Sequence, residues 1–297
     1  MKQNILIADS GSTKTDWAFM GERFHTQGIN PFHQDDDTIR AILKDELLPN
    51  LPSSLFPLPS SLNPLPSSLN PLPSSLSPLP SILFYGSGVR PELEGKMRRL
   101  LREVFPQATV IEAHSDLLGA CVALCGHHEG IACILGTGAN SCLYDGRRIV
   151  MNTPPLGYIL GDEGSGAVLG IRFLNALYKS RLPQPVREAF EANMGMDMSQ
   201  VIERVYRQPM ANRWLASLST FIHDYICEPA VEQLVIDNFC DFIRRNIVPY
   251  NRCDLPVNAV GSIAFYYSDQ LAKAVKEEGY TLGKIVRSPL DALVEME

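Results

Sequence analysis

The chain lacks three features that would assign it to other classes of protein. It has no excess of basic residues, because 26 Lys and Arg stand against 33 Asp and Glu, a formal net charge of -7. Nucleic-acid binding requires a basic footprint, so no nucleic-acid partner is expected. No apolar run approaches the length of a membrane span, and the first residues lack the apolar core of a signal peptide. We therefore expect a cytoplasmic protein with no membrane partner.

The sequence also lacks a cysteine framework. Its seven cysteines include no C-x-x-C pair, which is typical of proteins in a reducing compartment. Cys121 and Cys125 lie among Leu and Val on a predicted helix, where a buried thiol behaves as a small hydrophobic side chain. His127 and His128 have no carboxylate or cysteine at ligand spacing, so we interpret them as surface residues rather than as a metal site.

Two short apolar segments each run directly into a turn of small polar residues. Residues 131–135 lead into Gly-Thr-Gly-Ala-Asn-Ser at 136–141, and residues 5–8 lead into Asp-Ser-Gly-Ser-Thr-Lys-Thr at 9–15. Such apolar runs predict strands buried on both faces. Open α/β sheets bind ligands at the carboxyl ends of their strands, and glycine lets the backbone approach a ligand closely. Either turn alone would be an ordinary connection, but the pair predicts two phosphate-binding turns.

The two turns differ by one carboxylate. The first opens with Asp9, whereas the second contains no acidic residue. Mg²⁺ prefers oxygen ligands and keeps much of its hydration shell, so Asp9 is the candidate to hold this ion through water. Together the turns suggest two half-domains that close on one Mg-nucleotide.

Residues 51–81 contain four near-identical heptads that begin at Pro52, Pro59, Pro66 and Pro73. Two prolines in each heptad forbid a helix and interrupt sheet ladders, so the segment is predicted to be an extended or irregular surface loop. The alternative is a proline-rich docking peptide for a partner. We assign the repeat no catalytic role.

Asn30 follows a strand predicted at residues 24–27. Its amide either meets a polar ligand or satisfies the backbone of its own turn, and composition favours neither. The acidic run at residues 35–37 precedes a helix predicted over 38–48. Acidic residues favour a helix N-terminus, so we interpret this run as capping rather than as a metal site.

Two further candidates follow predicted strands. Ser87 comes after a strand at residues 82–85, and Asp116 lies between a strand at 110–111 and an apolar helix at 117–124. On position alone Asp116 is favoured as the N-cap of that helix. It also lies at a strand's carboxyl end, where a carboxylate can face a substrate.

The rest of the chain alternates hairpin, helices and strand. Asp145 and Gly146 form a strong hairpin signal. In order, we expect strands at 142–144 and 148–150, a glycine-rich turn at 161–166, a helix at 167–178, mostly helix from about 185 to 247, a strand at 257–260 and a helix at 266–277.

Four segments resemble the N-acetylglucosamine kinase and BadF-type ATPase family, within the superfamily of sugar kinases, actin and DnaK. Residues 9–15 resemble its first phosphate motif and 136–141 its second, while Leu-Gly-Asp-Glu-Gly-Ser at 160–165 is similar to a family-specific segment. Val-Gly-Ser-Ile-Ala at 260–264 looks like its adenosine motif. The four segments occur in the family's order, and the resemblance extends over most of the chain outside the heptads.

The resemblance implies an α/β architecture, a duplicated ribonuclease-H-like (actin-like ATPase) fold with ATP in a cleft between two lobes. The lobes would be residues 1–115, including the repeat at 51–81, and residues 116–297, with a helical insertion at about 185–250. The last helix is a candidate to pack back on the N-terminal lobe. ATP and Mg²⁺ would be the cofactors and a small sugar the partner, and a homodimer is left open.

The resemblance also implies roles for single residues. Asp116 matches the catalytic base that takes the sugar hydroxyl proton, and Asp9 matches the residue that organises Mg²⁺. Sugar contacts are assigned to Asn30, Ser87, Asn140 and Asp162. Nucleotide and phosphate contacts are assigned to Ser10, Gly11, Ser12, Thr13, Lys14, Thr15, Gly136, Thr137, Gly138, Gly261 and Ser262.

The chain departs from the family pattern at two places. Many sugar kinases of this family have Gly-Gly-Trp-Gly where residues 155–158 read Pro-Leu-Gly-Tyr, which puts the preference for an acetamido group in question. Ser262 stands where a second glycine is common. The leading functional hypothesis remains an ATP-dependent kinase for a hydroxyl of an amino sugar or hexose, with N-acetylglucosamine as the first choice.

Two alternatives come from other functional classes. An energising ATPase of the acyl-CoA dehydratase and reductase activator type holds an iron–sulfur cluster through a cysteine just before the second phosphate motif. Here Ile134 and Leu135 precede Gly136, and Cys133 falls in mid-strand, which disfavours this alternative. The other is a sugar or nucleotide sensor that binds without turnover. No helix-turn-helix extension or basic patch supports a repressor of this kind.

Overall fold

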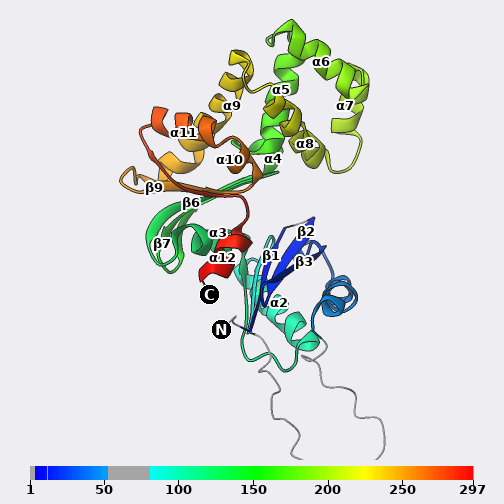
Figure 1. The fold of residues 1–297 in the computed structure, drawn as a ribbon, viewed down its shortest axis with the longest axis vertical. Coiled ribbons are helices and arrows are strands. Elements are labelled where there is room, and N and C mark those ends of the chain that lie inside the picture. Colours follow the sequence, from blue (N-terminus) through cyan, green and yellow to red (C-terminus); the bar gives the residue numbers. More distant parts are fainter. Residues whose placement is uncertain (1–3, 12, 53–80, 297) are drawn as a thin grey trace, which may run out of the picture. The chain divides into compact units, whose positions relative to one another are not determined.

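The computed structural model describes residues 4–11, 13–52 and 81–296 (Figure 1). Ser12 and most of the heptad repeat lie outside the described residues, so the loop prediction for 51–81 stays a prediction. The chain divides into two compact units, one of residues up to Gly119 together with Leu293–Glu295, and one of Ala120–Ala292. Each unit is organised around its own five-stranded sheet.

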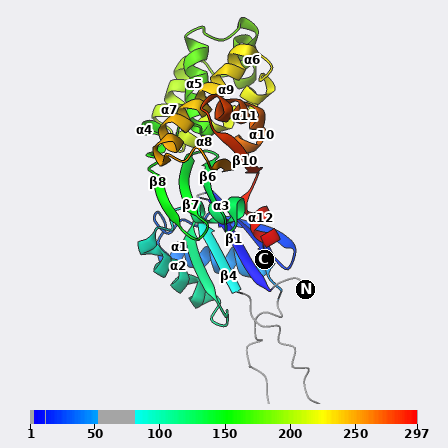
Figure 2. The same cartoon turned by 90° about the vertical axis from the view of Figure 1, so that its left-hand side faces the viewer.

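The sheet of the first unit has the strand order β3-β2-β1-β4-β5. Strands β1, β2 and β3 form an antiparallel meander, whereas β4 pairs parallel to β1 and β5 pairs parallel to β4. Figure 2 shows β1 and β4 side by side. The bounds are β1 Ile5–Ser10, β2 Lys14–Phe19, β3 Glu22–Gln27, β4 Ser81–Gly86 and β5 Ile111–Ser115.

The sheet of the second unit repeats this arrangement strand for strand. Its order is β10-β9-β6-β7-β8, with an antiparallel meander of β6, β7 and β8 and two parallel additions, β9 beside β6 and β10 beside β9. The repetition confirms the duplicated ribonuclease-H-like fold. The bounds are β6 Glu129–Leu135, β7 Ala139–Asp145, β8 Ile149–Thr153, β9 Pro256–Val260 and β10 Thr281–Val286.

The duplication extends to a helical segment that follows the third strand of each sheet. In the first unit, α1 (Asp36–Ala41) continues as a π-helical turn at Ile42–Leu47 and a 3₁₀ turn at Leu48–Asn50. In the second, α9 (Pro229–Phe242) continues likewise through Ile243–Ile247 and Val248–Tyr250. The segment predicted as a helix at 38–48 is therefore α-helical only at its start. It continues as the wider π-helical turn and ends in the 3₁₀ turn, which contains Pro49.

Each of these segments is tied to its sheet by polar contacts. The Glu46 carboxylate accepts hydrogen bonds from the main-chain N and the Nε2 of Gln27 on β3, both at 2.7 Å. The Asn246 carbonyl oxygen accepts from Thr153 Oγ1 on β8 at 2.9 Å. The same connection between third and fourth strands thus carries a docked helix in both units.

Helices cover the sheets and bury their apolar faces. In the first unit α1 and α2 contribute Ile39, Met97 and Leu100 to a core that includes Trp17 of β2 and Phe84 of β4. The second unit has a larger core with many helices, and Figure 1 shows α6, α7 and α8 grouped beside α5. The remaining helices are α2 Pro91–Val104, α3 Asp116–Cys125, α4 Gly157–Leu160, α5 Gly166–Tyr178, α6 Gln184–Met194, α7 Met198–Tyr206, α8 Ala211–Asp224, α10 Ser262–Tyr266, α11 Ser268–Glu277 and α12 Pro289–Met296.

The structure agrees with the burial expected for Cys121 and with the surface position expected for His127 and His128. Cys121 is buried, Cys125 is partly buried, and both are free thiols. His127 and His128 are exposed. Within the described part of the chain, no helix is long and apolar enough to cross a membrane.

Candidate active site

In the first unit, the carboxyl ends of three parallel strands bring candidate residues to one edge of the sheet. The register aligns Ser10 of β1 with Gly86 of β4, and Gly86 with Ser115 of β5. In the sequence, Asp9 precedes Ser10, Ser87 follows Gly86, and Asp116 follows Ser115. The amide N of Ser87 donates to the carbonyl O of Ser10 at 2.7 Å, which holds the turns after β1 and β4 together.

The pKa of the Asp9 carboxyl group is raised to about 7. Burial is the largest cause, the negative charges of Asp116 and Asp16 add to the rise, and Lys14 opposes it. Lys14 Nζ lies 2.9 Å from a carboxylate oxygen of Asp16. A cation beside Asp9 would favour its ionised form, and oxygen donors are those that Mg²⁺ prefers. The donor chemistry at Asp9 therefore fits the expected ion.

Asp116 is not the N-cap of α3, which corrects the interpretation favoured on position alone. Ser115 Oγ accepts a hydrogen bond from the amide N of Leu118 at 3.2 Å, the contact of an N-cap residue three positions ahead. Asp116 stands in the first turn of α3, and its Oδ1 accepts from the neighbouring Leu117 N at 2.8 Å. Burial raises the pKa of Asp116, and backbone hydrogen bonds oppose that rise.

The turn after β1 contains buried residues, whose hydroxyls bond within the protein, and exposed residues. Ser10 and Thr15 are buried, their hydroxyl oxygens lie 2.6 Å apart, and Ser10 Oγ donates to the carbonyl of Ile29 at 2.9 Å. Their hydroxyls are thus occupied within the protein. Gly11, Thr13 and Lys14 are exposed, and the Gly11 N donates to the Lys14 carbonyl at 2.9 Å to close the turn. Ser12 lies outside the described residues.

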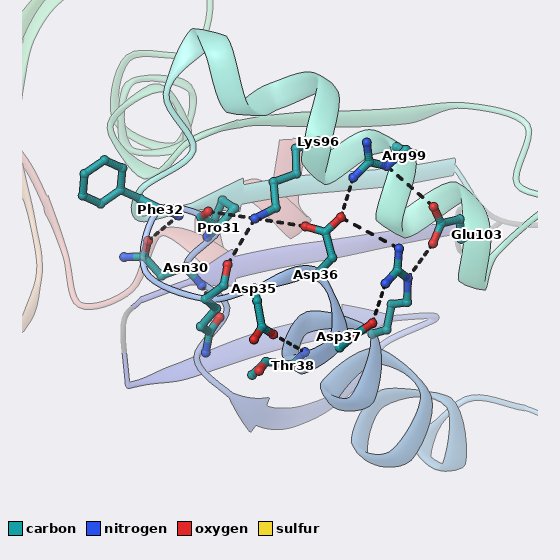
Figure 3. A network of polar contacts seen from close by, with 12 residues as sticks. Asn30, Pro31, Phe32, Asp35, Asp36, Asp37, Thr38, Lys96, Arg99 and Glu103 are labelled. Atoms are coloured by element: carbon teal, nitrogen blue, oxygen red, sulfur yellow. Dashed lines mark hydrogen bonds and ion pairs between the residues drawn. The ribbon is translucent and has the colours of Figure 1, made fainter.

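Asn30 lies in the first unit against the turn that carries Ser87. It is buried, with 6% of its surface exposed, and its Oδ1 accepts from the Phe32 N at 3.1 Å (Figure 3). A Cβ added at Gly88 would lie 2.0 Å from Asn30 Oδ1, so only glycine fits there. The amide oxygen of Asn30 therefore accepts a hydrogen bond within its own turn, which is one of the two interpretations of this residue. The structure also brings Asn30 close to the turn that contains Ser87.

In the second unit, the turn after β6 is held by the start of α5. Gly136 N donates to the carbonyl of Gly138 at 3.0 Å. The carbonyls of Gly136 and Thr137 accept from the amides of Gly166 and Ala167 at 2.8 and 3.2 Å. The hydroxyl-bearing side chain of Thr137 remains exposed.

Asp162 lies against this turn, within the second unit. A Cβ at Gly138 would lie 3.1 Å from Asp162 Oδ2. Asp162 has a positive φ of 55°, and burial raises the pKa of its carboxyl group to about 6, with a hydrogen bond from the Ala139 backbone opposing and Glu163 adding to the rise. The family resemblance assigned Asp162 and Asn30 together as sugar contacts. No feature of the sequence predicted that Asp162 lies close to Gly138.

Asn140 also belongs to the second unit, on β7. Its Oδ1 accepts from the Ser141 N and from Asn152 Nδ2, both at 2.9 Å. The amide oxygen of Asn140 therefore joins β7 to β8.

Gly261 completes the second unit's group of candidates. Its φ is 120°, and a Cβ would lie 2.3 Å from the carbonyl oxygen of Leu135, the last residue of β6. Its amide N donates to the carbonyl of Val286 on β10 at 3.1 Å. Gly261 thus links the start of α10, where Ser262 is exposed, to the turn after β6. The sequence analysis did not predict β10.

One cluster of potential metal ligands lies elsewhere among the described residues. The ligand atoms of Cys240, Glu277 and Glu278 lie within 4.8 Å of one another. Glu278 already pairs with Arg244 at 2.6 Å, so this cluster is explained by an ion pair.

No protein-family model and no curated protein matches this sequence. A crystal structure of a putative N-acetylglucosamine kinase from Porphyromonas gingivalis is 45% identical over 98% of each chain, with a TM-score of 0.86. A protein of the same name from Chromobacterium violaceum is 18% identical over 98% of each chain, with a TM-score of 0.63. A ROK family glucokinase from Streptomyces griseus, solved with glucose and AMPPNP, is 13% identical over 98% of this chain and 97% of its own, with a TM-score of 0.50.

The second and third of these similarities show the fold alone. The first has an identity high enough, over nearly the whole of both chains, to show common descent. It agrees with the four motifs and with the repeated sheet topology. The chain belongs to the N-acetylglucosamine kinase and BadF-type ATPase family.

Proposed function

We propose that the chain is an ATP-dependent sugar kinase that phosphorylates a hydroxyl group of an amino sugar or related hexose. The observation that carries the proposal is the pair Asp9 and Asp116, two carboxylates at one edge of the first sheet whose pKa values are both raised by burial. Asn30 and Ser87 belong to the same unit. The name of the 45% identical Porphyromonas gingivalis relative, an N-acetylglucosamine kinase, supports transfer to a sugar rather than to water.

The chemistry needs few groups. Phosphoryl transfer passes through a loose transition state, so positioning and charge neutralisation matter most. We assign Asp116 as the base that accepts the proton of the attacking hydroxyl. A base works best when its pKa is near the operating pH, and burial shifts the pKa of Asp116 in that direction.

We assign Asp9 as the residue that would hold Mg²⁺, through water. When bound, the ion would neutralise negative charge on the phosphate groups. The exposed hydroxyls of Thr13 and Thr137 are assigned to phosphate contacts. Ser10 and Thr15, whose hydroxyls are occupied, can contribute only through their backbone.

N-acetylglucosamine is the first acceptor to test. The Porphyromonas gingivalis relative carries that name. The segments around Asn30 and Asp162 resemble those of N-acetylglucosamine kinases. The point to test is the acetamido group, because the family's Trp-bearing segment is replaced by Pro-Leu-Gly-Tyr at 155–158. In this stretch Leu156 is exposed and has a φ of 61°.

The test is ATP consumption by the purified protein across a panel of hexoses and amino sugars, with the sugar phosphate identified by mass. We expect slow hydrolysis of ATP alone and a large increase with the correct acceptor, because the aligned hydroxyl then replaces water as the nucleophile. Asp269→Asn, at an exposed site on α11, serves as the control variant. ATPase activity that no acceptor changes, with no phosphorylated sugar, would refute the kinase and favour the energising ATPase.

A further inference from the structure

The loop of residues 28–35, here called the Asn30 loop, connects β3 to α1 and fixes its own shape. The Asn30 carbonyl accepts from the amides of His33 and Gln34 at 3.1 and 3.0 Å. The Asn30 N donates to Gln34 Oε1 at 2.8 Å, and Gln34 Nε2 donates to the Gly28 carbonyl at 2.9 Å. The Gly28 N also donates to the Thr13 carbonyl at 3.0 Å, which anchors the first part of the loop.

Lys96 of α2 anchors the second part. Its Nζ lies 3.1 Å from the carbonyl O of Pro31, 3.1 Å from that of Gln34 and 3.1 Å from Asp36 Oδ1 (Figure 3). An ammonium group has three donor hydrogens, so these acceptors use its full capacity. The Lys96 side chain is only 22% exposed, which limits competition from water.

Two arginine side chains also contact the carboxylate of Asp36, but their hydrogen bonds and ion pairs among the described residues do not include the Asn30 loop. Arg99 lies 2.5 Å and Arg40 3.8 Å from Asp36 Oδ2, and both also bind Glu103 (Figure 3). The hydrogen bond from Lys96 is the largest cause of the lowered pKa of Asp36. Lys96 therefore differs from Arg99 by its bonds to two main-chain carbonyls of the Asn30 loop.

The turn that leads into α2 touches the same loop twice more. The Gly88 backbone lies against the Asn30 amide, and the Arg90 guanidinium carbon lies 4.1 Å above the centroid of the Phe32 ring. The element that carries Ser87 thus contacts the Asn30 loop at Asn30, Phe32 and, through Lys96, at Pro31 and Gln34. A change at Lys96 would release one of three attachments and leave the other two.

We propose that Lys96 is a positioning residue for acceptor recognition, which holds Asn30 in a fixed place relative to Ser87. The inference rests on the proposed function, because it takes Asn30 as a sugar contact. It predicts an effect on the sugar and none on the nucleotide, since the hydrogen bonds and ion pair of Lys96 among the described residues are with the Asn30 loop and Asp36.

Lys96→Met tests the proposal because it keeps an unbranched side chain and removes all three hydrogen bonds. Misplacement of a binding group by about 1 Å can cost up to 10²-fold, so we expect the KM for the sugar to rise about tenfold. The KM for ATP and kcat should stay within about twofold. Lys96→Arg should recover part of the loss, because a guanidinium can also donate to carbonyls.

Arg99→Met is the matched control, since it removes a cation from Asp36 on the same helix. It should leave the KM for the sugar unchanged. Hydrogen exchange at the His33 and Gln34 amides provides a measurement independent of activity. Exchange should become faster in Lys96→Met and remain unchanged in Arg99→Met.

The outcomes separate this inference from the proposed function. An active Lys96→Met enzyme with an unchanged KM for the sugar, or an equal rise in Arg99→Met, would overturn the role of Lys96 and leave the kinase intact. If Lys96→Met does not fold, Lys96→Arg must show the same selective change in KM, or the inference is wrong. A wild-type protein that phosphorylates no sugar refutes the proposed function, and the inference with it.

Discussion

The two sheets share one topology but differ at the end of their first strand. In the first unit β1 ends beside Asp9, a carboxyl group whose pKa burial raises to about 7. In the second unit β6 ends at Leu135 and is followed by Gly136, which leaves no charge at the corresponding place. The shared fold determines where a ligand-facing turn forms, whereas the residue at that point determines whether the turn also offers a metal ligand.

A second difference lies in the connection from the third strand to the fourth. In the second unit this connection contains α4 to α9, while in the first it contains α1 and its π and 3₁₀ turns before the heptad repeat. Both sheets nevertheless keep the same order. Insertions at this point therefore change the size of a unit without disturbing the strand ends that carry the candidate residues.

The largest effect is expected at Asp116, the base proposed at the edge of the first sheet. Asp116→Asn should lower sugar phosphorylation about 10²- to 10⁴-fold, the usual contribution of a general base, and leave nucleotide binding intact. Asparagine can still accept the hydrogen bond from the Leu117 N, so α3 should remain folded. The measurements are kcat with the acceptor sugar and the Kd of a nucleotide analogue.

Ser115→Ala is the control for this prediction because Ser115 caps α3. Loss of an N-cap costs about 1 kcal/mol of stability, but turnover should persist. Near wild-type turnover in Asp116→Asn, together with strong loss in Ser115→Ala, would show that the start of α3 acts only through its structure.

The next effect concerns the charge that distinguishes the two turns. Asp9→Asn should raise the Mg²⁺ concentration needed for half-maximal activity, with any acceptor, by roughly 10- to 100-fold, the typical cost of losing a group that binds a metal through an intermediary. The titration of activity against Mg²⁺ at saturating sugar measures it. Asp162→Asn in the second unit should shift this titration much less, and an equal shift in both variants would contradict the asymmetry.

A smaller effect is expected on stability, at the contact between Gly261 and the turn after β6. Gly261→Ala places a Cβ 2.3 Å from the Leu135 carbonyl at a φ of 120°, so it should lower the free energy of unfolding by about 2 kcal/mol. Gly136→Ala meets no atom within 4 Å and should change it by less than about 0.5 kcal/mol. Urea denaturation of both variants measures the difference, and equal losses would show that the turn after β6 is strained as a whole.

Much of the fold was predictable because its central strands are short apolar runs. The sequence located β1, β6 and β9, and the Asp145-Gly146 hairpin between β7 and β8. It missed β10, whose exposed and partly buried residues give no clear pattern. That strand depends on a distant contact, in which the Lys284 N donates to Asn258 Oδ1 at 2.8 Å. Similarly, the π-helical turn after α1 contacts β3, and the helix propensities of its own residues do not predict that contact.

The candidate site was predictable as a set of residues but not as an arrangement. The choice between Ser115 and Asp116 as N-cap depends on where β5 ends by one residue, and sequence patterns do not resolve boundaries so finely. The contact of Lys96 with Pro31 joins residues far apart in sequence, and neither has an unusual local pattern. The occupied hydroxyls of Ser10 and Thr15 likewise appear only once Ile29 is placed beside them.

The pH dependence of stability compares Asp9 in one unit with Asp162 in the other. Their pKa values are raised in the folded protein to about 7 and about 6, whereas in the unfolded chain both carboxyl groups ionise near their ordinary pKa of 3.8. Between pH 4 and the raised values the folded state binds more protons, so stability falls as pH rises through this window. In the absence of Mg²⁺, Asp162→Asn should flatten the decline up to about pH 6, and Asp9→Asn should flatten it up to about pH 7. Mg²⁺ should restore the midpoint of thermal unfolding more at pH 7.5 than at pH 5, because an ionised Asp9 attracts the cation. A wild-type midpoint that rises from pH 5 to 7.5 in a Mg²⁺-free buffer, unchanged by Asp9→Asn, would show that Asp9 is already ionised in the folded protein.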